Sequence, residues 1–331
     1  PPLASEIRTI TEQKLTGLCY QYVYDHRNRL VEKRLPGKNW EFMVYDKQDR
    51  LIASGPTLFP FGGNNLGWLI TKYDAIGRQA YTGWYNGHMS ISSDNRIAMQ
   101  LAMEASSTMN ETRVSSNMVN GIVIGYSSNS LPNVSLYLLT VTYYDDYTFP
   151  GHPTVPSTIE EQTVLTNVKG LQTGGFSRTL LNEGTYIGDS SYILYDSKSR
   201  PIRNYVNSYL GGYTSTDTKL DWRGKVLNTI QKHKRLNSDT EITVRNNFTY
   251  SAQERLLTHT HQIGSGAIEM LANNQYDELG NLIGKGVGDV ASNSQRLQDI
   301  SYSYNVRGWL KKINDIDNLV QIGSRPDLFA F

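Results

Sequence analysis

The chain has 331 residues, of which 38% are hydrophobic and 19% charged, and its 32 basic and 31 acidic residues leave a formal net charge of +1. This hydrophobic content is too high for a disordered chain, and the balanced charge gives no electrostatic footprint for nucleic acid or an anionic membrane. The single cysteine, Cys19, excludes an internal disulfide and a thiolate zinc site.

The 22 tyrosines and the scarcity of Ala and Glu runs predict that strand dominates over helix. No segment approaches 18 continuous apolar residues, so direct membrane insertion is not expected. Residues 1–4 do not resemble a signal peptide, and residues 327–331 resemble an interrupted strand. We therefore expect the sequence to be part of a longer polypeptide.

Residues 1–85 are predicted to form three antiparallel hairpins after a polar lead-in over 5–17. Alternating side chains indicate the strand pairs 18–24 with 30–35, 40–45 with 51–54, and 69–73 with 78–84. The segment 56–67 is rich in Gly, Pro and Asn and is predicted to be a loop.

Residues 86–190 are predicted to be an insertion of a short helix, loops and strands. Ile97, Leu101 and Met103 indicate an amphipathic helix over about 95–105, with Asp94 as a candidate N-cap and a loop rich in Ser and Asn after it. Beyond this loop, strands are expected over 121–126 and 135–144 and a proline-rich loop over 149–156. The segment 159–171 is predicted to be either an irregular strand or a brief helix.

Residues 191–331 are predicted to return to hairpins, because corresponding positions recur every 25 to 30 residues, which is room for about two strands and their turns. The strand 300–304 alternates large apolar and small polar side chains, so one of its faces is expected to be packed and the other wet.

A seven-residue motif recurs at the bends of these hairpins, and its clearest copy runs from Tyr276 to Leu282. The carboxylate of Asp277 is expected to accept backbone N–H groups two residues on, and Gly280 to adopt a positive φ. Six Tyr-Asp pairs occur where random placement would give about one. The candidate structural residues of the repeat are Tyr24, Asp25, Arg29, Tyr45, Asp46, Arg50, Tyr73, Asp74, Gly77, Arg78, Tyr195, Asp196, Arg200, Asp221, Gly224, Tyr250, Arg255, Tyr276, Asp277, Gly280, Tyr304 and Gly308.

The motif arginines have two possible environments. Each either pairs with an Asp of an adjacent hairpin, which would link the copies as a ladder, or stays solvated without a partner. An exposed pair of this kind would set the register between hairpins more than it would add stability.

A hairpin cannot bury its hydrophobic face alone, and almost no helix is available to cover the sheet. We therefore expect an all-β fold in which antiparallel hairpin repeats form a curling sheet. A sandwich and a propeller are the alternatives, but a propeller takes four strands per about 40 to 50 residues. A spiralling sheet around an interior space is favoured.

The repeats resemble the Rhs/YD repeats, whose pattern is close to Tyr-Asp-x-x-Gly-Arg-Leu. The resemblance covers most of the chain outside about 86–190, and the insertion after Tyr73 looks most similar to large Rhs-type proteins of the Bacteroidota. It implies a segment of a YD-repeat β-shell, of the kind shared with toxin-complex C components and teneurins.

The resemblance also implies a function. The chain would be a non-catalytic segment of a secreted or cell-surface bacterial protein, whose shell encloses or presents a C-terminal toxin or effector. The implied partners are the remainder of its own polypeptide, including such a toxin, and a secretion translocon, with type IX export in the Bacteroidota. Any enzymatic activity would lie in the toxin domain. The alternatives are a surface adhesin that binds glycans and, as a third reading, a hydrolase.

Other patterns indicate ordinary structure, so no catalytic, cofactor-binding or metal-binding residue is predicted. The Tyr-Asp carboxylates are interpreted as turn caps, because a catalytic pair needs one carboxyl with a raised pKa. His259 and His261 share a strand face and could begin a metal site, but a third ligand cannot be named. Asn110, Asn133 and Asn247 match glycosylation acceptors and are interpreted as loop asparagines.

Overall fold

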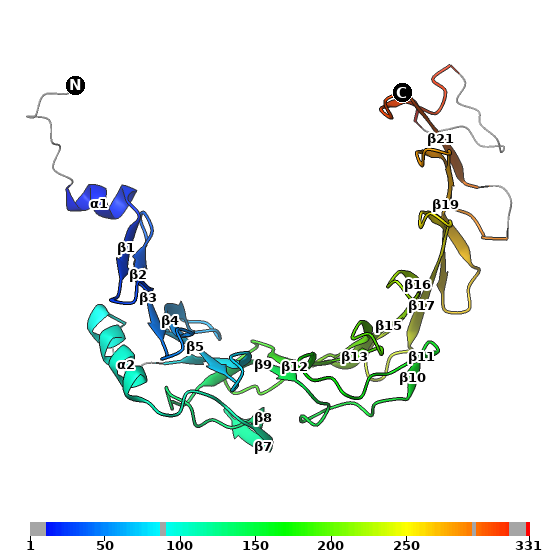
Figure 1. Ribbon diagram of the computed structural model, residues 1–331. Coiled ribbons are helices and arrows are strands. Elements are labelled where there is room, and N and C mark those ends of the chain that lie inside the picture. Colours follow the sequence, from blue (N-terminus) through cyan, green and yellow to red (C-terminus); the bar gives the residue numbers. More distant parts are fainter. Residues whose placement is uncertain (1–10, 87–90, 293–295, 318–328) are drawn as a thin grey trace, which may run out of the picture. The chain divides into compact units, whose positions relative to one another are not determined.

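The computed structural model describes residues 11–86, 91–292, 296–317 and 329–331. Within these ranges the chain consists mainly of antiparallel strands, with two helices, α1 (Glu12–Leu18) and α2 (Ser93–Ala105) (Figure 1). It divides into two compact units, residues 1–153 with 169–190, and residues 154–168 with 191–331. The expected all-β fold of antiparallel hairpins with a minor helical insertion is confirmed.

Eight strands of the first unit form one run of antiparallel pairs in the order β1, β2, β3, β4, β5, β6, β9, β12. Because β6 pairs with β9, the insertion leaves this sheet and then rejoins it. The bounds are β1 (Gln21–Tyr24), β2 (Leu30–Arg34), β3 (Trp40–Tyr45), β4 (Leu51–Leu58), β5 (Leu66–Tyr73), β6 (Gln79–Tyr85), β9 (Tyr137–Tyr144) and β12 (Gln172–Arg178).

The core of the first unit lies where this sheet meets the insertion. Ile70 of β5 and Leu138 of β9 are fully buried, as is Ile124 of β8. A separate hairpin of β7 (Arg113–Val119) and β8 (Ile122–Tyr126) contributes to this core. Helix α2 packs on β3, where the side-chain amide of Gln100 accepts from the backbone N–H of Tyr45 and donates to its carbonyl, both at 2.9 Å.

In the second unit, β14 to β22 pair antiparallel in chain order, one hairpin after another (Figure 1). Two short strands, β10 (Thr158–Ile159) and β11 (Gln162–Thr163), form a small hairpin, and β13 (Gly188–Tyr195) begins in the first unit and ends in the second. The other bounds are β14 (Pro201–Asn207), β15 (Gly211–Leu220), β16 (Val226–Leu236), β17 (Ile242–Tyr250), β18 (Leu256–Ile263), β19 (Glu269–Tyr276), β20 (Leu282–Val287), β21 (Gln298–Tyr304) and β22 (Leu310–Ile313).

Three central strands of the second unit have little cover. No residue of β16, β17 or β18 is buried. Large apolar side chains stay in contact with solvent, and Ile242 and Ile263 are 52% and 58% exposed. The described part of the chain therefore supplies no second layer over this part of the sheet.

The predicted loop 56–67 is too long, because β4 and β5 extend into it and leave only 59–65 as the connection. Pro56 has no N–H to give to a strand partner. The register between the two strands shifts between Ser54 and Thr57, so Pro56 falls at a bulge where no such donor is needed.

Other predicted boundaries also need correction. The lead-in contains α1, whose N-cap Thr11 accepts from the backbone N–H of Lys14 at 3.4 Å. Ser92, not Asp94, caps α2, and Asp94 lies in its first turn. The segment rich in Ser and Asn beyond α2 includes strand β7, and Asn247 lies in β17 and not in a loop.

The segment 159–171 is neither one strand nor a helix. It contains only the end of β10 and the short β11, and most of the remainder forms turns and bends. The predictions made for residues 1–4 and for 327 and 328 lie outside the described residues.

Candidate functional site

The repeat motif forms the same bend in its copies starting at residues 24, 45, 73, 195, 220, 250, 276 and 304. In each copy the backbone N–H of the second residue donates to the carbonyl of the sixth at 2.8–3.1 Å. The N–H of the fifth residue donates to the carbonyl of the second at 2.9–3.1 Å. The fifth residue has a φ between 60° and 102°, which is the left-handed region that closes a three-residue hairpin loop.

The aspartate at the second position holds this bend together. In the first copy, Asp25 Oδ1 accepts the backbone N–H groups of Arg27 and Arg29, both at 2.9 Å. Its Oδ2 accepts from Arg29 Nε at 2.7 Å. The same Nε contact, also at 2.7 Å, joins Arg50 to Asp46, Arg78 to Asp74 and Arg200 to Asp196. These four arginines therefore pair first with the aspartate of their own bend, which sequence reasoning did not anticipate.

Each motif arginine also reaches the next copy. The guanidinium of Arg29 lies 5.0 Å from the centroid of the Tyr45 ring, and that of Arg50 lies 4.8 Å from the Tyr73 ring. Arg29 Nη1 donates to the carbonyl of Asp46 at 3.3 Å. Equivalent bonds join Arg50 to the Asp74 carbonyl at 3.3 Å and Arg200 to the Asp221 carbonyl at 2.9 Å.

The motif tyrosine contacts the preceding copy. Its hydroxyl donates to the carbonyl of the seventh residue in the preceding copy at 2.8–2.9 Å, for the pairs Tyr45–Leu30, Tyr73–Leu51, Tyr250–Val226, Tyr276–Leu256 and Tyr304–Leu282. We call these contacts between successive bends, from arginine to tyrosine ring and from tyrosine hydroxyl to carbonyl, the ladder.

The ladder crosses the insertion. Arg78 lies 4.3 Å from the centroid of the Tyr144 ring, and its Nη1 donates to Asp145 Oδ1 at 2.9 Å while Nη2 contacts Oδ2. Asp145 also accepts the backbone N–H of Gly170 at 2.7 Å. Tyr144 and Asp145 keep only the first two motif positions, yet they receive the arginine as a full copy does. This contact, like that of Arg29 Nη1 with Asp49 Oδ1 at 2.8 Å, is the pairing with an adjacent hairpin, one of the two environments that the sequence left open.

Four copies depart from the pattern. In the last one, Asn305 replaces the aspartate and Trp309 replaces the arginine, and Asn305 Oδ1 accepts from the backbone N–H groups of Arg307 and Trp309 at 2.9 and 3.0 Å. Ser251 replaces the aspartate, and its Oγ accepts from the backbone N–H groups of Gln253 and Arg255 at 3.2 Å. The Arg255 guanidinium then has no carboxylate partner among the described residues and lies 5.7 Å from the Tyr276 ring centroid. Lys225 and Asn281 replace the arginine elsewhere: Lys225 Nζ lies 4.9 Å from the Tyr250 ring, and Asn281 donates to Asp277 Oδ2 at 2.9 Å.

The electrostatics of the bends favour ionised carboxylates. Burial alone would raise the pKa of Asp25 and Asp196, but hydrogen bonds from the arginine of the same bend lower both. Hydrogen bonds from Arg78 hold the pKa of Asp145 at about 2. A general acid needs a raised pKa, so these lowered pKa values disfavour acid catalysis. They favour charge-assisted hydrogen bonds that hold the bend together.

A buried ion pair in the first unit was missed by sequence reasoning. Lys72 Nζ donates to the carbonyls of Ser130 and Pro132 at 2.5 and 2.9 Å and lies 3.7 Å from Glu111 Oε1. The Glu111 carboxylate also accepts the hydroxyls of Ser127 and Ser130, each at 2.6 Å. Lys72 and Glu111 are 3% and 1% exposed. These bonds fix the segment 127–132 on β5, and burial lowers the pKa of Lys72 to about 8.

The two strand histidines converge on an amide. His259 Nε2 and His261 Nδ1 each lie 3.0 Å from Asn246 Oδ1, so both nitrogens donate to one oxygen. His259 stacks on Phe248, with ring centroids 4.5 Å apart. Within the described ranges, no group of three or more His, Cys, Asp or Glu side chains is placed to hold a metal ion.

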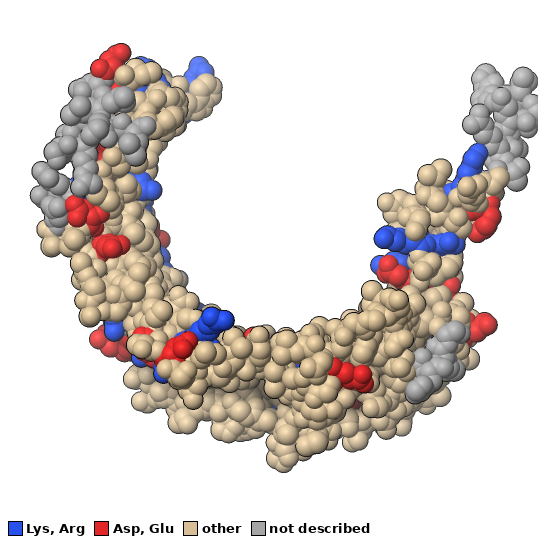
Figure 2. Space-filling model, turned by 180° about the vertical axis from the view of Figure 1, so that it is seen from behind, with Lys and Arg blue, Asp and Glu red and all other residues tan. Residues whose placement is uncertain are grey.

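The surface and the helices provide further observations. Figure 2 shows basic and acidic side chains interspersed among uncharged residues on one face of the molecule. Neither α1 nor α2 has the length and apolar character to span a bilayer, and the described residues contain no helix that does.

Solved structures that are similar to the chain include toxin-complex assemblies. The crystal structure of TcdB2-TccC3-TEV matches 89% of the chain at 11% identity with a TM-score of 0.33. The Photorhabdus luminescens Tc holotoxin pore, carrying a TccC3 mutation, and the crystal structure of TcdB2-TccC3-Cdc42 match the same share at the same identity, with TM-scores of 0.32 and 0.25. The chain spans only 13% or 14% of the length of these chains. No protein-family model and no curated protein matches it.

Proposed function

We propose that this chain is a non-catalytic wall segment of an Rhs/YD-repeat protein that is secreted or displayed by a bacterium. The wall encloses or presents another part of the same polypeptide, such as a C-terminal toxin or effector. The observation that carries the proposal is the ladder, because it repeats one bend and one inter-bend clamp along the chain.

The contacts of the ladder are of the kind that a wall built from successive hairpins needs. Most bends are closed by their own aspartate. Where the arginine and tyrosine are present, the arginine contacts the next bend and the tyrosine contacts the preceding one. Successive hairpins can extend the sheet without helices to hold them. A wall that keeps few free strand edges would shield an unfolded passenger from water and from other proteins.

The exposure of strands β16, β17 and β18 is a reason to expect a further polypeptide layer over them. Ile242 and Ile263 are more than half exposed in this chain alone, and Leu236 is 39% exposed. Contiguous exposed apolar surface of this kind usually marks an interaction site. The remainder of the same polypeptide is the partner that the proposal assigns to it.

The proposal contains no catalytic role for the chain. The motif carboxylates with shifted pKa values are all stabilised in their ionised form. The buried Lys72 and Glu111 form hydrogen bonds with the segment 127–132. Activity would reside in the enclosed domain.

The finer part of the proposal concerns export. The tyrosine-rich repeats and the insertion after Tyr73 favour a protein of the Bacteroidota, with a type IX translocon as its export partner. The coding sequence on both sides of this segment tests this part, since a sorting domain would support it and a different export signal would contradict it.

The experiment that tests the enclosure is a cryo-EM structure of the full polypeptide. We expect the strands described here to form part of a wall around an interior that contains the C-terminal segment. A solid core without an interior space, or a C-terminal segment that lies free outside, would overturn the proposal.

Limited proteolysis of the full polypeptide gives a second readout. The C-terminal segment should resist cleavage in the native protein and become sensitive when Arg50→Met and Arg200→Met break the ladder. Arg235→Met is the matched control, because Arg235 is an exposed β16 arginine outside the motif. If the C-terminal segment is as resistant to cleavage in the Arg50→Met and Arg200→Met variants as in the Arg235→Met control, the proposed role of the ladder is contradicted.

A further inference from the structure

Successive hairpins separate before they reach their bends. Strand pairing with the preceding hairpin stops three residues before the first motif residue, as at Phe42 before Tyr45, Asp217 before Leu220 and Asn273 before Tyr276. Within its own hairpin, this first residue pairs with the seventh motif residue next to a register shift. The end of each of these strands therefore lines a gap between two bends.

Two glutamine side chains enter such gaps. Gln100 of α2 accepts from the backbone N–H of Tyr45 and donates to its carbonyl, both at 2.9 Å. Gln162 of β11 accepts from the N–H of Leu220 at 3.0 Å and donates to the carbonyl of Thr218 at 2.9 Å. An amide presents a donor beside an acceptor, which matches the outward N–H and C=O groups of a strand end. Neither glutamine belongs to the hairpins that it contacts.

The segment that carries Gln162 contacts two bends. The N–H of Leu165 donates to the carbonyl of Tyr195 at 2.8 Å, while Gln162 bonds to the next bend. A cavity of about 180 Å³ remains beside this segment, lined by Gln162, Thr163 and residues of the two bends. The gap between the bends at 195 and 220 is thus bridged by a segment from outside their hairpins.

A second cavity, of about 220 Å³, lies between the bends at 250 and 276. The second and sixth motif residues of the first bend and the first three of the second line both cavities. The lining of the second cavity comes only from these two hairpins: Ser251, Gln253, Arg255, Leu257, Tyr276, Asp277 and Glu278. In the described part of the chain, no other segment takes the place of Gln162 and Thr163.

The backbone of Tyr276 also lacks the partner that Tyr45 has. Tyr276 pairs with Leu282 of its own hairpin in the register in which Tyr45 pairs with Leu51, so its N–H faces the gap. Among the described residues, none outside that hairpin bonds to this N–H. A hydrogen-bonding position that is filled at Tyr45 is therefore open at Tyr276.

The motif arginine of the second cavity is open in the same way. Arg50 Nη2 donates to the carbonyl of Met109 at 3.2 Å and to Asn110 Oδ1 at 2.8 Å, both from the insertion. Arg255 has the same motif position, but its guanidinium has no hydrogen-bond partner among the described residues, and its nitrogens remain in contact with solvent. An acceptor from another segment can therefore reach it.

The two cavities carry similar charges. Each is lined by two carboxylates and one guanidinium, from Asp196, Asp221 and Arg200 in the first and from Asp277, Glu278 and Arg255 in the second. The excess of carboxylate disfavours an anionic side chain, and the amide of Gln162 is neutral. The second cavity is smaller than the about 300 Å³ at which small-molecule pockets begin, and its size suits one side chain.

We propose that the cavity between the bends at 250 and 276 receives a glutamine side chain from an extended segment of the same polypeptide. The glutamine accepts from the N–H of Tyr276 and donates to a carbonyl at the end of β19, and a carbonyl of the same segment accepts from Arg255. The intrachain segments at the other bends use these contacts. The inference rests on the proposed function, because that function supplies a further part of the polypeptide.

The test is an NMR titration of the 331-residue chain, labelled with ¹⁵N-tyrosine, with the capped neutral peptide Gln-Thr-Val-Leu-Thr, which copies residues 162–166. Tyr276→Phe and Tyr45→Phe identify the two amide signals of interest. We expect the peptide to shift the Tyr276 signal and to leave the Tyr45 signal in place, because Gln100 already bonds to Tyr45. The same peptide with alanine in place of glutamine should shift neither signal.

Arg255→Met should weaken binding of the peptide about tenfold, because one hydrogen bond from a charged donor is lost. Arg235→Met, which removes an exposed arginine of β16 outside the cavity, is the control and should leave binding unchanged. Equal binding by the two variants would contradict the placement of the segment. If Arg255→Met fails to fold, the comparison of the two peptides decides the question.

Other results would also overturn the assignment. They are the absence of a shift at Tyr276 with millimolar peptide, equal shifts at Tyr276 and Tyr45, and equal shifts with both peptides. In a cryo-EM structure of the full polypeptide, an empty cavity in a wall that encloses its C-terminal segment would contradict this inference and leave the proposed function intact. A filled cavity in a polypeptide without an enclosed interior would contradict the proposed function alone.

Discussion

At the residue scale, one aspartate closes most of the bends, and Ser251 or Asn305 takes its place in two of them. The aspartate Oδ1 accepts two backbone N–H groups and its Oδ2 accepts from an arginine, as Asp46 does with Gln48, Arg50 and the Arg50 side chain. Hydrogen bonds to a charged acceptor are about twice as strong as neutral ones. The aspartate thus holds both the turn and the arginine that contacts the next hairpin.

The copy with Ser251 allows this role to be tested by restoring the aspartate and measuring the gain in stability. Ser251→Asp should raise the free energy of unfolding by about 0.5–1 kcal/mol, because the new carboxylate would pair with Arg255, which has no carboxylate partner among the described residues. Urea denaturation measures the change. Ser251→Asn is the control, since an amide can accept the turn N–H groups without a charge. If the Asn variant is as stable as the Asp variant, the ion pair contributes nothing.

The acid dependence of stability should depend on Asp145. Arg78 holds its pKa at about 2, below the ordinary value of 3.8, so the folded protein favours the ionised form. The stabilisation is fully present above pH 3.8 and is lost as the pH falls through about 2. Asp145→Asn should therefore flatten the loss of stability across this window, as measured by thermal unfolding at a series of pH values. The same slope in Asp145→Asn and in the exposed control Asp94→Asn would contradict the assignment.

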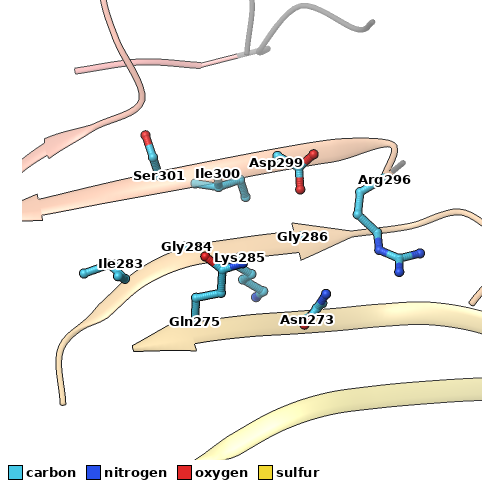
Figure 3. A pocket seen from close by; sticks show the side chains of 10 residues that line it. All are labelled: Asn273, Gln275, Ile283, Gly284, Lys285, Gly286, Arg296, Asp299, Ile300 and Ser301. Atoms are coloured by element: carbon cyan, nitrogen blue, oxygen red, sulfur yellow. The ribbon is translucent and has the colours of Figure 1, made fainter. Parts of the chain in front are cut away.

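Local chemistry was predictable from the sequence, and distant contacts were not. Asp277 and Gly280 act within seven residues, so turn propensity alone located the bend and the positive φ. The partner of Arg78 lies 67 residues away, and Gln100 bonds to Tyr45 across 55 residues. Pairings of this kind depend on which strands become neighbours. A pocket of about 310 Å³ over β20 (Figure 3) was not predicted, because it depends on the register of three strands over two glycines.

At the scale of the elements, the tyrosine hydroxyl links each hairpin to the one before it. Tyr276 donates to the Leu256 carbonyl at 2.9 Å, and this contact joins the end of β19 to the start of β18. The hairpin elements were predicted well because strand period and turn residues agree. Strand ends were predicted less well, as at β4 and β5, where a bulge accommodates Pro56 and extends the pairing.

Removing this hydroxyl should loosen two hairpins without changing the ring contact. Tyr276→Phe is expected to lower the free energy of unfolding by about 0.5–1.5 kcal/mol, the usual value of one hydrogen bond. Chemical denaturation provides the measurement. Tyr22→Phe, at an exposed position of β1, is the control and should change stability by less than about 0.5 kcal/mol. Equal effects in the two variants would show that the hydroxyl bond adds no stability.

At the scale of the whole molecule, protection is expected to be uneven. Strands β16 to β18 contain no buried residue, whereas β5 and β6 include Ile70, Ala80 and Tyr81, each at most 1% exposed. Amide hydrogen exchange of the isolated chain should therefore be faster in β16 to β18 than in β5 and β6. In the full polypeptide, protection of β16 to β18 should rise. No rise would contradict the proposed covering layer.

The central claim is that the ladder couples neighbouring hairpins, and a double-mutant cycle between Arg50 and Tyr73 tests it most directly. The two residues belong to successive bends, with the guanidinium 4.8 Å from the ring centroid. We predict a coupling free energy of about 0.5–1.5 kcal/mol between Arg50→Met and Tyr73→Leu, and a value near zero between Arg50→Met and the control Tyr22→Phe. Additive effects of Arg50→Met and Tyr73→Leu would contradict the account.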